Sequence, residues 1–339
     1  MSWLISNSSE SPKLAAGELI CKQEKAMENQ KHNWVAVDIA KDELDLLDDR
    51  RGWKGRNESG AINRLVAGFK KRSDVWVICE ATGGYEREFV AALHAAQIKV
   101  CVVSPNRVRA FARSEGVLAK TDKIDAAMIL KFAKNKNLRP TQPPPKEQVE
   151  VAALMDRRTQ LNDFLTQEKN RVQNSPSAIH GLIKKMIRTI ERQIETVEKQ
   201  IRAIVESTQT MRERHKLFCS VSGIGEVTSW SLIAYLDELG KLKRSEVVAL
   251  VGLAPFNRDS GKKKGKRYIQ GGRAKLRSSL YMAAKTAARF NPVIKPYVQR
   301  LLEKEKPYNC VMVAAMRKLI IHLHCLTKNN QLILASTTQ

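Results

Sequence analysis

Short apolar runs alternate with helix-like segments in the first third of the chain. The runs WVAVDIA (34–40), VWVICEA (75–81) and KVCVVSP (99–105) are rich in β-branched residues, and segments with helical spacing lie around 61–71 and 85–97. We interpret DELDLLDD (42–49) as a continuation of the first strand. Strands that alternate with helices predict an α/β domain with parallel strands, whose carboxyl ends collect ligand groups.

A different pattern begins after the proline-rich segment LRPTQPPPKEQ (138–148), which we interpret as a linker. Apolar residues then recur at alternating spacings of four and three, as in a heptad repeat. They are Ile183, Ile187, Ile190, Ile194, Val197, Ile201 and Ile204. With a compatible apolar face before NSPS (174–177), this pattern predicts an antiparallel coiled-coil hairpin over 149–214. The seam serves either internal packing or a second chain, and we favour dimerisation.

The charge of the chain indicates a polyanionic partner. Its 339 residues carry 59 Lys and Arg against 35 Asp and Glu, a net charge of +24, and the hydrophobic fraction of 43% is ordinary for a folded protein. Residues 240–280 alone contain twelve Lys and Arg and two acidic residues. Nucleic acid is therefore the leading candidate partner.

Targeting signals are absent from the pattern. No apolar run is expected to reach the roughly 20 residues of a membrane span, and residues 1–30 resemble no signal peptide. We expect a disordered, dispensable leader over 1–30, a tail over 331–339 and a cytoplasmic, bacterial protein that binds no membrane. Six scattered cysteines without a CxxC pair predict reduced thiols, most of them in the core.

Four acidic residues stand at informative positions. Asp38 interrupts the first apolar strand and Glu80 ends the second, where an unpaired charge is costly. Asp122 and Asp125 share one face at the start of a predicted helix; Thr121 as N-cap and the helix dipole would explain them without any ligand. Convergence of all four would instead favour Mg²⁺ or Mn²⁺. We expect the nearby Asp42, Glu43, Asp45, Asp48 and Asp49 to be mostly solvated.

A second candidate site lies in the stretch VGLAPFNRDSGKKKGKRYIQGGRAKLRSSLYMAA (251–284). Ser260 stands among cations that could stabilise charge during attack on a phosphodiester, although Asp259-Ser260-Gly261 also fits a plain turn. Upstream, SVSGIGEVTSWSLIAYL resembles the glycine turn of a helix-hairpin-helix. The candidate nucleic-acid contacts are Arg258, Lys262, Lys263, Lys264, Lys266, Arg267, Arg273, Lys275 and Arg277.

The motifs VDIAK, CEATGGYE and AKTDKIDA, followed by GIG, GLAP and the Ser260 loop, resemble the DEDD transposases of the insertion-sequence one-ten family, which are related to pilin-gene invertases. The resemblance spans nearly everything after Met27. It implies an α/β plus all-α chain: a ribonuclease-H-like, RuvC-like domain over 31–137, the linker, the coiled-coil arm, and a mainly helical transposase domain over 215–330.

The resemblance also implies the chemistry. Asp38, Glu80, Asp122 and Asp125 correspond to the family's metal-binding set, and Ser260 corresponds to its nucleophilic serine, which forms a covalent link to DNA. Family members act as dimers of dimers and are guided by a bridge RNA whose loops pair with target and donor DNA.

Three functions compete at this point. The first is an RNA-guided recombinase with a metal site and a serine nucleophile. The second is a metal-only junction endonuclease, in which water attacks and Ser260→Ala keeps cleavage. The third is a non-catalytic nucleic-acid scaffold, which needs no divalent ion.

Overall fold

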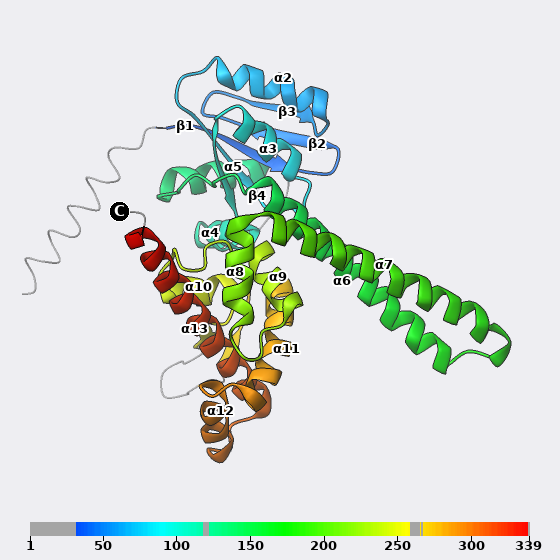
Figure 1. The fold of residues 1–339 in the computed structure, drawn as a ribbon. Coiled ribbons are helices and arrows are strands. Elements are labelled where there is room, and N and C mark those ends of the chain that lie inside the picture. Colours follow the sequence, from blue (N-terminus) through cyan, green and yellow to red (C-terminus); the bar gives the residue numbers. More distant parts are fainter. Residues whose placement is uncertain (1–31, 118–121, 258–264, 266, 338–339) are drawn as a thin grey trace, which may run out of the picture. The chain divides into compact units, whose positions relative to one another are not determined.

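The computed structural model describes residues 32–117, 122–257, 265 and 267–337, without the side chains of 122–124 and 331–337. The chain divides into two compact units, residues 1–143 and 144–339. The predicted leader, Thr121 and most of the Ser260 loop lie outside the described residues. An α/β unit followed by a mainly helical unit confirms the general fold class (Figure 1). The ribonuclease-H-like assignment stays a prediction.

A five-stranded mixed sheet forms the centre of the first unit, in the order β3-β2-β1-β4-β5. The strands are β1 (Asn33–Ile39), β2 (Glu43–Leu47), β3 (Gly52–Arg56), β4 (Val75–Glu80) and β5 (Lys99–Val103). Strands β1, β4 and β5 are parallel, as predicted. The prediction that residues 42–49 continue the first strand is wrong, because the Ala40 N–H donates to the Glu43 carbonyl and β2 turns back antiparallel to β1.

Helices cover both faces of this sheet (Figure 1). Helices α2 (Ser59–Lys70) and α3 (Arg87–Ala95) pack on the face that carries Val35, Val37 and Val77. Helices α4 (Pro105–Ser114) and α5 (Asp122–Asn135) pack on the opposite face, which carries Ala36 and Ile78. Alternate strand residues therefore belong to two separate cores, and this parity decides where the strand acids point.

Asp48 and the start of the linker differ from the sequence interpretation. Asp48 is buried rather than solvated: its Oδ1 accepts the N–H groups of Arg50 and Arg51 at 2.9 Å, and Oδ2 lies 3.0 Å from Arg72 Nη2. Burial alone would raise the pKa of Asp48, but these donors outweigh it and leave the pKa below its usual value. The predicted linker also begins inside the unit, because Thr141 bonds to the backbone of β5.

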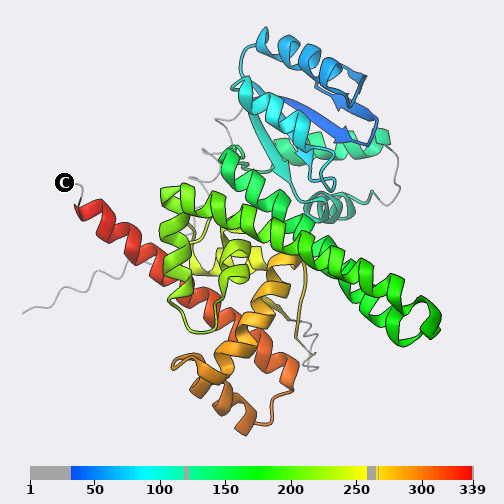
Figure 2. The same ribbon diagram turned by 45° about the vertical axis from the view of Figure 1, so that its right-hand side comes forward.

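The second unit is almost entirely helical (Figure 2). Its elements are α6 (Lys146–Gln173), η1 (Ser177–Ile179), α7 (His180–Ser207), α8 (Gln209–Cys219), α9 (Glu226–Tyr235), α10 (Arg244–Val251), β6 (Pro255–Phe256), β7 (Tyr268–Ile269), α11 (Ala274–Phe290), α12 (Ile294–Glu303) and α13 (Tyr308–Thr337). One apolar core joins these helices to the base of α6 and α7.

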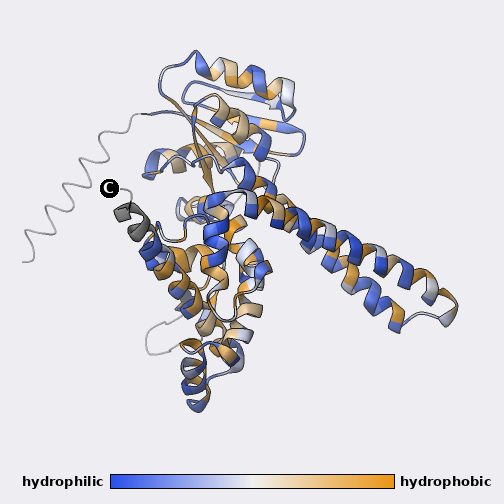
Figure 3. Cartoon of the chain, viewed as in Figure 1, coloured by the Kyte–Doolittle hydropathy of each residue, from blue (hydrophilic) through white to orange (hydrophobic). Residues whose placement is uncertain are grey.

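Helices α6 and α7 form the predicted hairpin, and its seam is filled from within the chain. Ile190, Val197 and Ile201 of α7 are buried in one cluster with Leu161 of α6, and Arg158 Nε lies 2.8 Å from Glu198 Oε1 across the pair. Figure 3 shows hydrophobic and hydrophilic residues mixed along both helices. The heptad positions are thus used for packing within the chain, which was one of the two alternatives. Dimerisation through the hairpin stays a prediction.

Helix α13 corrects the expectation about apolar length. Residues 308–330 are long and apolar enough to cross a membrane by length and composition. Half of the apolar window is buried, and Val311, Leu319 and Leu323 are fully buried in the core of the helical unit. The apolarity of α13 therefore has an explanation in core packing.

Candidate active site

The register of β1 and β4 places the first two predicted acids side by side. Val37 pairs with Cys79 in the parallel ladder, so the next residues, Asp38 and Glu80, are neighbours on adjacent strands. Both have the parity of Ala36 and Ile78, which face α4 and α5. Both carboxylates are half-buried and stand where their strands end.

Helix α5 runs antiparallel to β1, and this direction brings its start to the same end of the sheet. Lys134 near the end of α5 pairs with Asp49, and the β1–β2 register, in which Ala36 faces Leu47, puts Asp49 near Trp34 at the start of β1. From Lys134 back to Asp125 the helix covers about 13.5 Å, and from Trp34 to Asp38 the strand covers about 13 Å. From these lengths we expect Asp125 to lie near the level of Asp38.

The face of α5 also favours convergence. Asp125 precedes Ile129 by four positions and Ala133 by eight, and both of these side chains are buried against the sheet. Residues at this spacing share one helix face. Asp122, three positions earlier, belongs to the same stripe by position, and its side chain lies outside the described ones.

Sequence reasoning missed a third strand acid in this row. Asp45 of β2 is directly opposite Asp38 in the antiparallel register, so Asp45, Asp38 and Glu80 stand across three neighbouring strands. Lys54 Nζ lies 3.4 Å from Asp45 Oδ1 and supplies a compensating charge. The sequence could have revealed Asp45 if residues 42–49 had been interpreted as the second strand of a hairpin, because Asp45 and Asp38 then point to the same face. That relation is lost if residues 42–49 continue β1.

Two further polar residues order the loops beside the acids. Glu86 Oε2 accepts the N–H groups of Thr82 and Gly84, at 3.1 and 2.8 Å, and so closes the loop after β4. Asn57 Nδ2 donates to the carbonyls of Ala40 and Tyr85, at 2.9 and 3.1 Å, and ties that loop to the end of β1. Neither role follows from local sequence, because the partners come from separate segments.

The donor chemistry of this edge fits a hard divalent cation, since carboxylate oxygens are the ligands that Mg²⁺ and Mn²⁺ prefer. Among the side chains that the structure describes, which exclude Asp122, no three His, Cys, Asp or Glu groups lie close enough to hold a metal ion. The neighbouring Cys79 is no candidate ligand: burial, and then the charge of Glu86, raises the pKa of its thiol to about 12.

The loop that contains Ser260 joins two short paired strands. Pro255 pairs with Ile269 and Phe256 pairs with Tyr268, so β6 and β7 fix the two ends of the loop. Ser260 and the predicted contacts Arg258, Lys262, Lys263, Lys264 and Lys266 lie outside the described residues. Arg267 is described, and its side chain is exposed.

The other three predicted nucleic-acid contacts have partners within the chain. Arg273 makes a bidentate pair with Glu238, at 2.7 and 2.6 Å. Lys275 Nζ lies 2.6 Å from Asp156 Oδ1. Arg277 donates to the carbonyls of Val251 and Gly271. Such contacts favour a structural role for the two arginines over phosphate binding, which stays an untested prediction.

Comparison with known proteins assigns the chain to a family. A DEDD transposase model of insertion sequence IS110 matches residues 29–176, and the model described as "Transposase IS116/IS110/IS902 family" matches residues 215–299. The chain belongs to the IS110 family of transposases. The first match covers the strand acids and α5, and the second covers the Ser260 loop.

Curated relatives agree with this assignment. The pilin gene-inverting proteins of Moraxella lacunata and Moraxella bovis are each 26% identical over 311 residues, which span 88% of this chain and 96% of the relative. This IS110-family protein is accordingly an enzyme, a DNA transposase or recombinase. Its DEDD domain implies dependence on a divalent metal.

Proposed function

We propose that this transposase cuts and rejoins DNA through a covalent serine–DNA intermediate, with Ser260 as nucleophile and Asp38, Glu80, Asp122 and Asp125 as the acids of a Mg²⁺ or Mn²⁺ site. The observation that supports the proposal is the β1–β4 register, which sets Asp38 beside Glu80 where the two strands end. The start of α5, with Asp122 and Asp125, is expected at the same end of the sheet. Carboxylates gathered at one sheet edge repel one another unless cations hold them.

In the attack step the Ser260 hydroxyl loses its proton and its oxygen bonds to phosphorus. The bond between phosphorus and the departing deoxyribose oxygen breaks, and that oxygen takes up a proton. The cations around Ser260 in the sequence support this role, because positive charge stabilises the phosphorane-like transition state. A bound divalent ion would supply electrostatic stabilisation of phosphate oxygens.

We further propose that a structured bridge RNA guides the enzyme to donor and target DNA, that the active assembly is a dimer of dimers, and that the protein acts in the bacterial cytoplasm. The net charge of +24 supports binding of two nucleic acids at once. Exposed apolar residues on α7, Leu182 and Met186, support contact between chains along the hairpin.

A covalent-adduct gel tests the nucleophile. Wild-type protein, the DNA ends of its element, the associated RNA and Mg²⁺ are expected to give a labelled protein–DNA adduct on a denaturing gel, and Ser260→Ala is expected to give none. Cleavage by both proteins without an adduct would support the metal-only endonuclease instead. Activity of neither would favour the scaffold.

The same gel tests the acids. Asp38→Asn is expected to lower adduct formation by at least about 100-fold, since a lost ligand or electrostatic group costs on that order. Asp49→Asn is the matched control, because Asp49 is an exposed acid at the opposite end of the same strands. Equal activity of the two variants would contradict a catalytic acid at Asp38.

A further inference from the structure

The β6–β7 hairpin is too small to hold its own position. Each strand has two residues, and only two residue pairs join them. A two-stranded hairpin is marginally stable in water even when it is longer. Its placement must therefore come from contacts outside the hairpin. Leu253, just before β6, is buried, Ile269 of β7 packs against the core, and the segment that follows β7 supplies further contacts.

The backbone after β7 interlocks with the end of α10. Gly252 and Gly272 both have positive φ, 78° and 66°, and a Cβ on either one would overlap the backbone of the opposite segment. The Arg273 N–H donates to the Leu250 carbonyl at 3.1 Å, and Arg277 Nη1 donates to the Val251 carbonyl at 3.2 Å. The chain leaving the hairpin is thus fixed to α10 before α11 begins.

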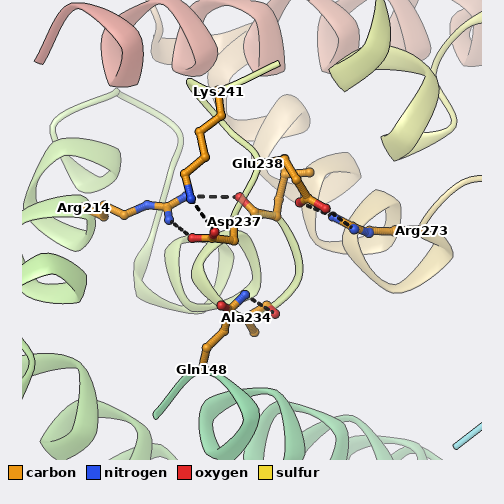
Figure 4. A network of polar contacts seen from close by, with 8 residues as sticks. Gln148, Arg214, Ala234, Asp237, Glu238, Lys241 and Arg273 are labelled. Carbon is orange, nitrogen blue, oxygen red and sulfur yellow. Dashed lines mark hydrogen bonds and ion pairs between the residues drawn. The ribbon is translucent and has the colours of Figure 1, made fainter. Parts of the chain in front are cut away.

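The Arg273 side chain adds a second attachment, to the end of α9. Its guanidinium forms two parallel bonds with the Glu238 carboxylate, and Nη1 also donates to the Tyr235 carbonyl at 2.6 Å. Figure 4 shows this pair beside a group of three residues in which Arg214 and Lys241 both contact Asp237. A bidentate fork fixes orientation as well as distance.

We propose that Glu238 and Arg273 are a positioning pair that sets the orientation of the β6–β7 hairpin and, through it, of Ser260. The catalytic consequence rests on the proposed serine chemistry, whereas the anchoring does not. The side chains of Arg273 and Glu238 are 34% and 36% exposed, so the pair lies at the rim of the helical unit. Its loss should loosen the hairpin without unfolding the core.

Three variants test the pair. Glu238→Gln removes the charge at nearly constant shape, and Arg273→Lys keeps the charge but loses the planar fork. Asp237→Asn is the matched control, because Asp237 is the adjacent residue and pairs with Arg214 of α8 and Lys241, at 2.7 and 2.6 Å, and not with the hairpin segment. All three are compared at equal fraction folded, with the full-length chain.

Hydrogen exchange of residues 256–257 and 267–269 measures anchoring directly, since Pro255 has no amide hydrogen. We expect at least about tenfold faster exchange there in Glu238→Gln and Arg273→Lys, with α9 and α13 unchanged, and wild-type exchange in Asp237→Asn. Adduct formation is expected to fall about 10- to 100-fold in the first two variants only, as for a nucleophile displaced by about 1 Å.

The outcomes separate the two proposals. Wild-type exchange in both pair variants, or equal acceleration in Asp237→Asn, would overturn the anchoring. Faster hairpin exchange with wild-type adduct rates would overturn the positioning role. If the wild-type protein forms no serine adduct while hairpin exchange is still faster in the two pair variants, the serine chemistry is contradicted and the anchoring stands.

Discussion

The buried imidazole of His324 is the residue through which we expect the helical unit to respond to pH. Its ring is 3% exposed, and Nδ1 accepts the N–H of Gly240 at 3.0 Å, so the neutral ring is the form that the fold needs. Burial, followed by the charges of Lys328 and Arg244, lowers the pKa of His324. Protonation would add a charge and remove the acceptor at once.

We therefore expect stability to depend on pH through this residue. A folded-state pKa below the unfolded value of about 6.5 means that the unfolded chain binds the proton more tightly, so the contribution is fully present above pH 6.5 and is lost as pH falls below it. His324→Asn keeps an acceptor near Nδ1 without the titration. As the pH is lowered from 8 through 6.5 to 5.5, the urea midpoint should fall more steeply for the wild-type protein than for His324→Asn. Parallel decreases would contradict this assignment.

Single residues differ in how much the sequence says about them. The placement of Asp38 and Glu80 followed from charges inside apolar strands, because any buried charge needs a partner or an ion. The burial of Asp48 did not follow, since its partner Arg72 is on the far side of α2 in the sequence. Partners that are distant along the chain are supplied by the fold alone.

The turn between α8 and α9 contains two glycines with different roles. Gly223 has φ 104°, and a Cβ there would lie 2.8 Å from the backbone N of Ala287 in α11. Gly225 has φ −96°, and a Cβ there would meet open space. The first glycine is thus required by helix packing, and the second is free to serve a ligand such as phosphate.

We expect Gly223→Ala to lower the free energy of unfolding by about 3 kcal/mol, from backbone strain and overpacking together. Gly225→Ala should change it by less than about 1 kcal/mol, because its backbone suits any residue. Chemical denaturation of both variants checks the difference. If Gly225→Ala nonetheless weakens DNA binding in a filter assay, the turn binds phosphate; equal destabilisation by both would contradict the packing argument.

At the scale of elements, two kinds of segment were predicted best. The α6–α7 hairpin follows its long periodic pattern, and strands β4 and β5 follow short apolar runs bounded by polar residues. Strand β3 was missed, since GWKGR is short, charged and contains two glycines. The direction of β2 was missed because one tight turn between Ala40 and Glu43 reverses the chain, and a turn this short does not alter the pattern of hydrophobic residues.

For the molecule as a whole, the distribution of charge decides how nucleic acid binds. The chain carries +24 overall, but five Lys and Arg lie within six residues, 262–267. If this segment contacts phosphates directly, its lysines release counterions on binding, whereas dispersed charges contribute only a general attraction. The two cases differ in salt dependence rather than in affinity at a single salt concentration.

We expect replacement of Lys262, Lys263, Lys264 and Lys266 by Gln to reduce the slope of log affinity against log salt by about 3 to 4 for duplex DNA, at about 0.9 per lost contact. The matched control replaces Lys184, Lys185, Arg188 and Lys199 of α7, which are exposed, and lowers the net charge by the same amount. Titrations between 50 and 200 mM salt, as in ordinary counterion-release measurements, distinguish the two variants. A control that flattens the slope as much as the loop variant would show that binding follows total charge, and would remove the nucleic-acid role proposed for the segment around Ser260.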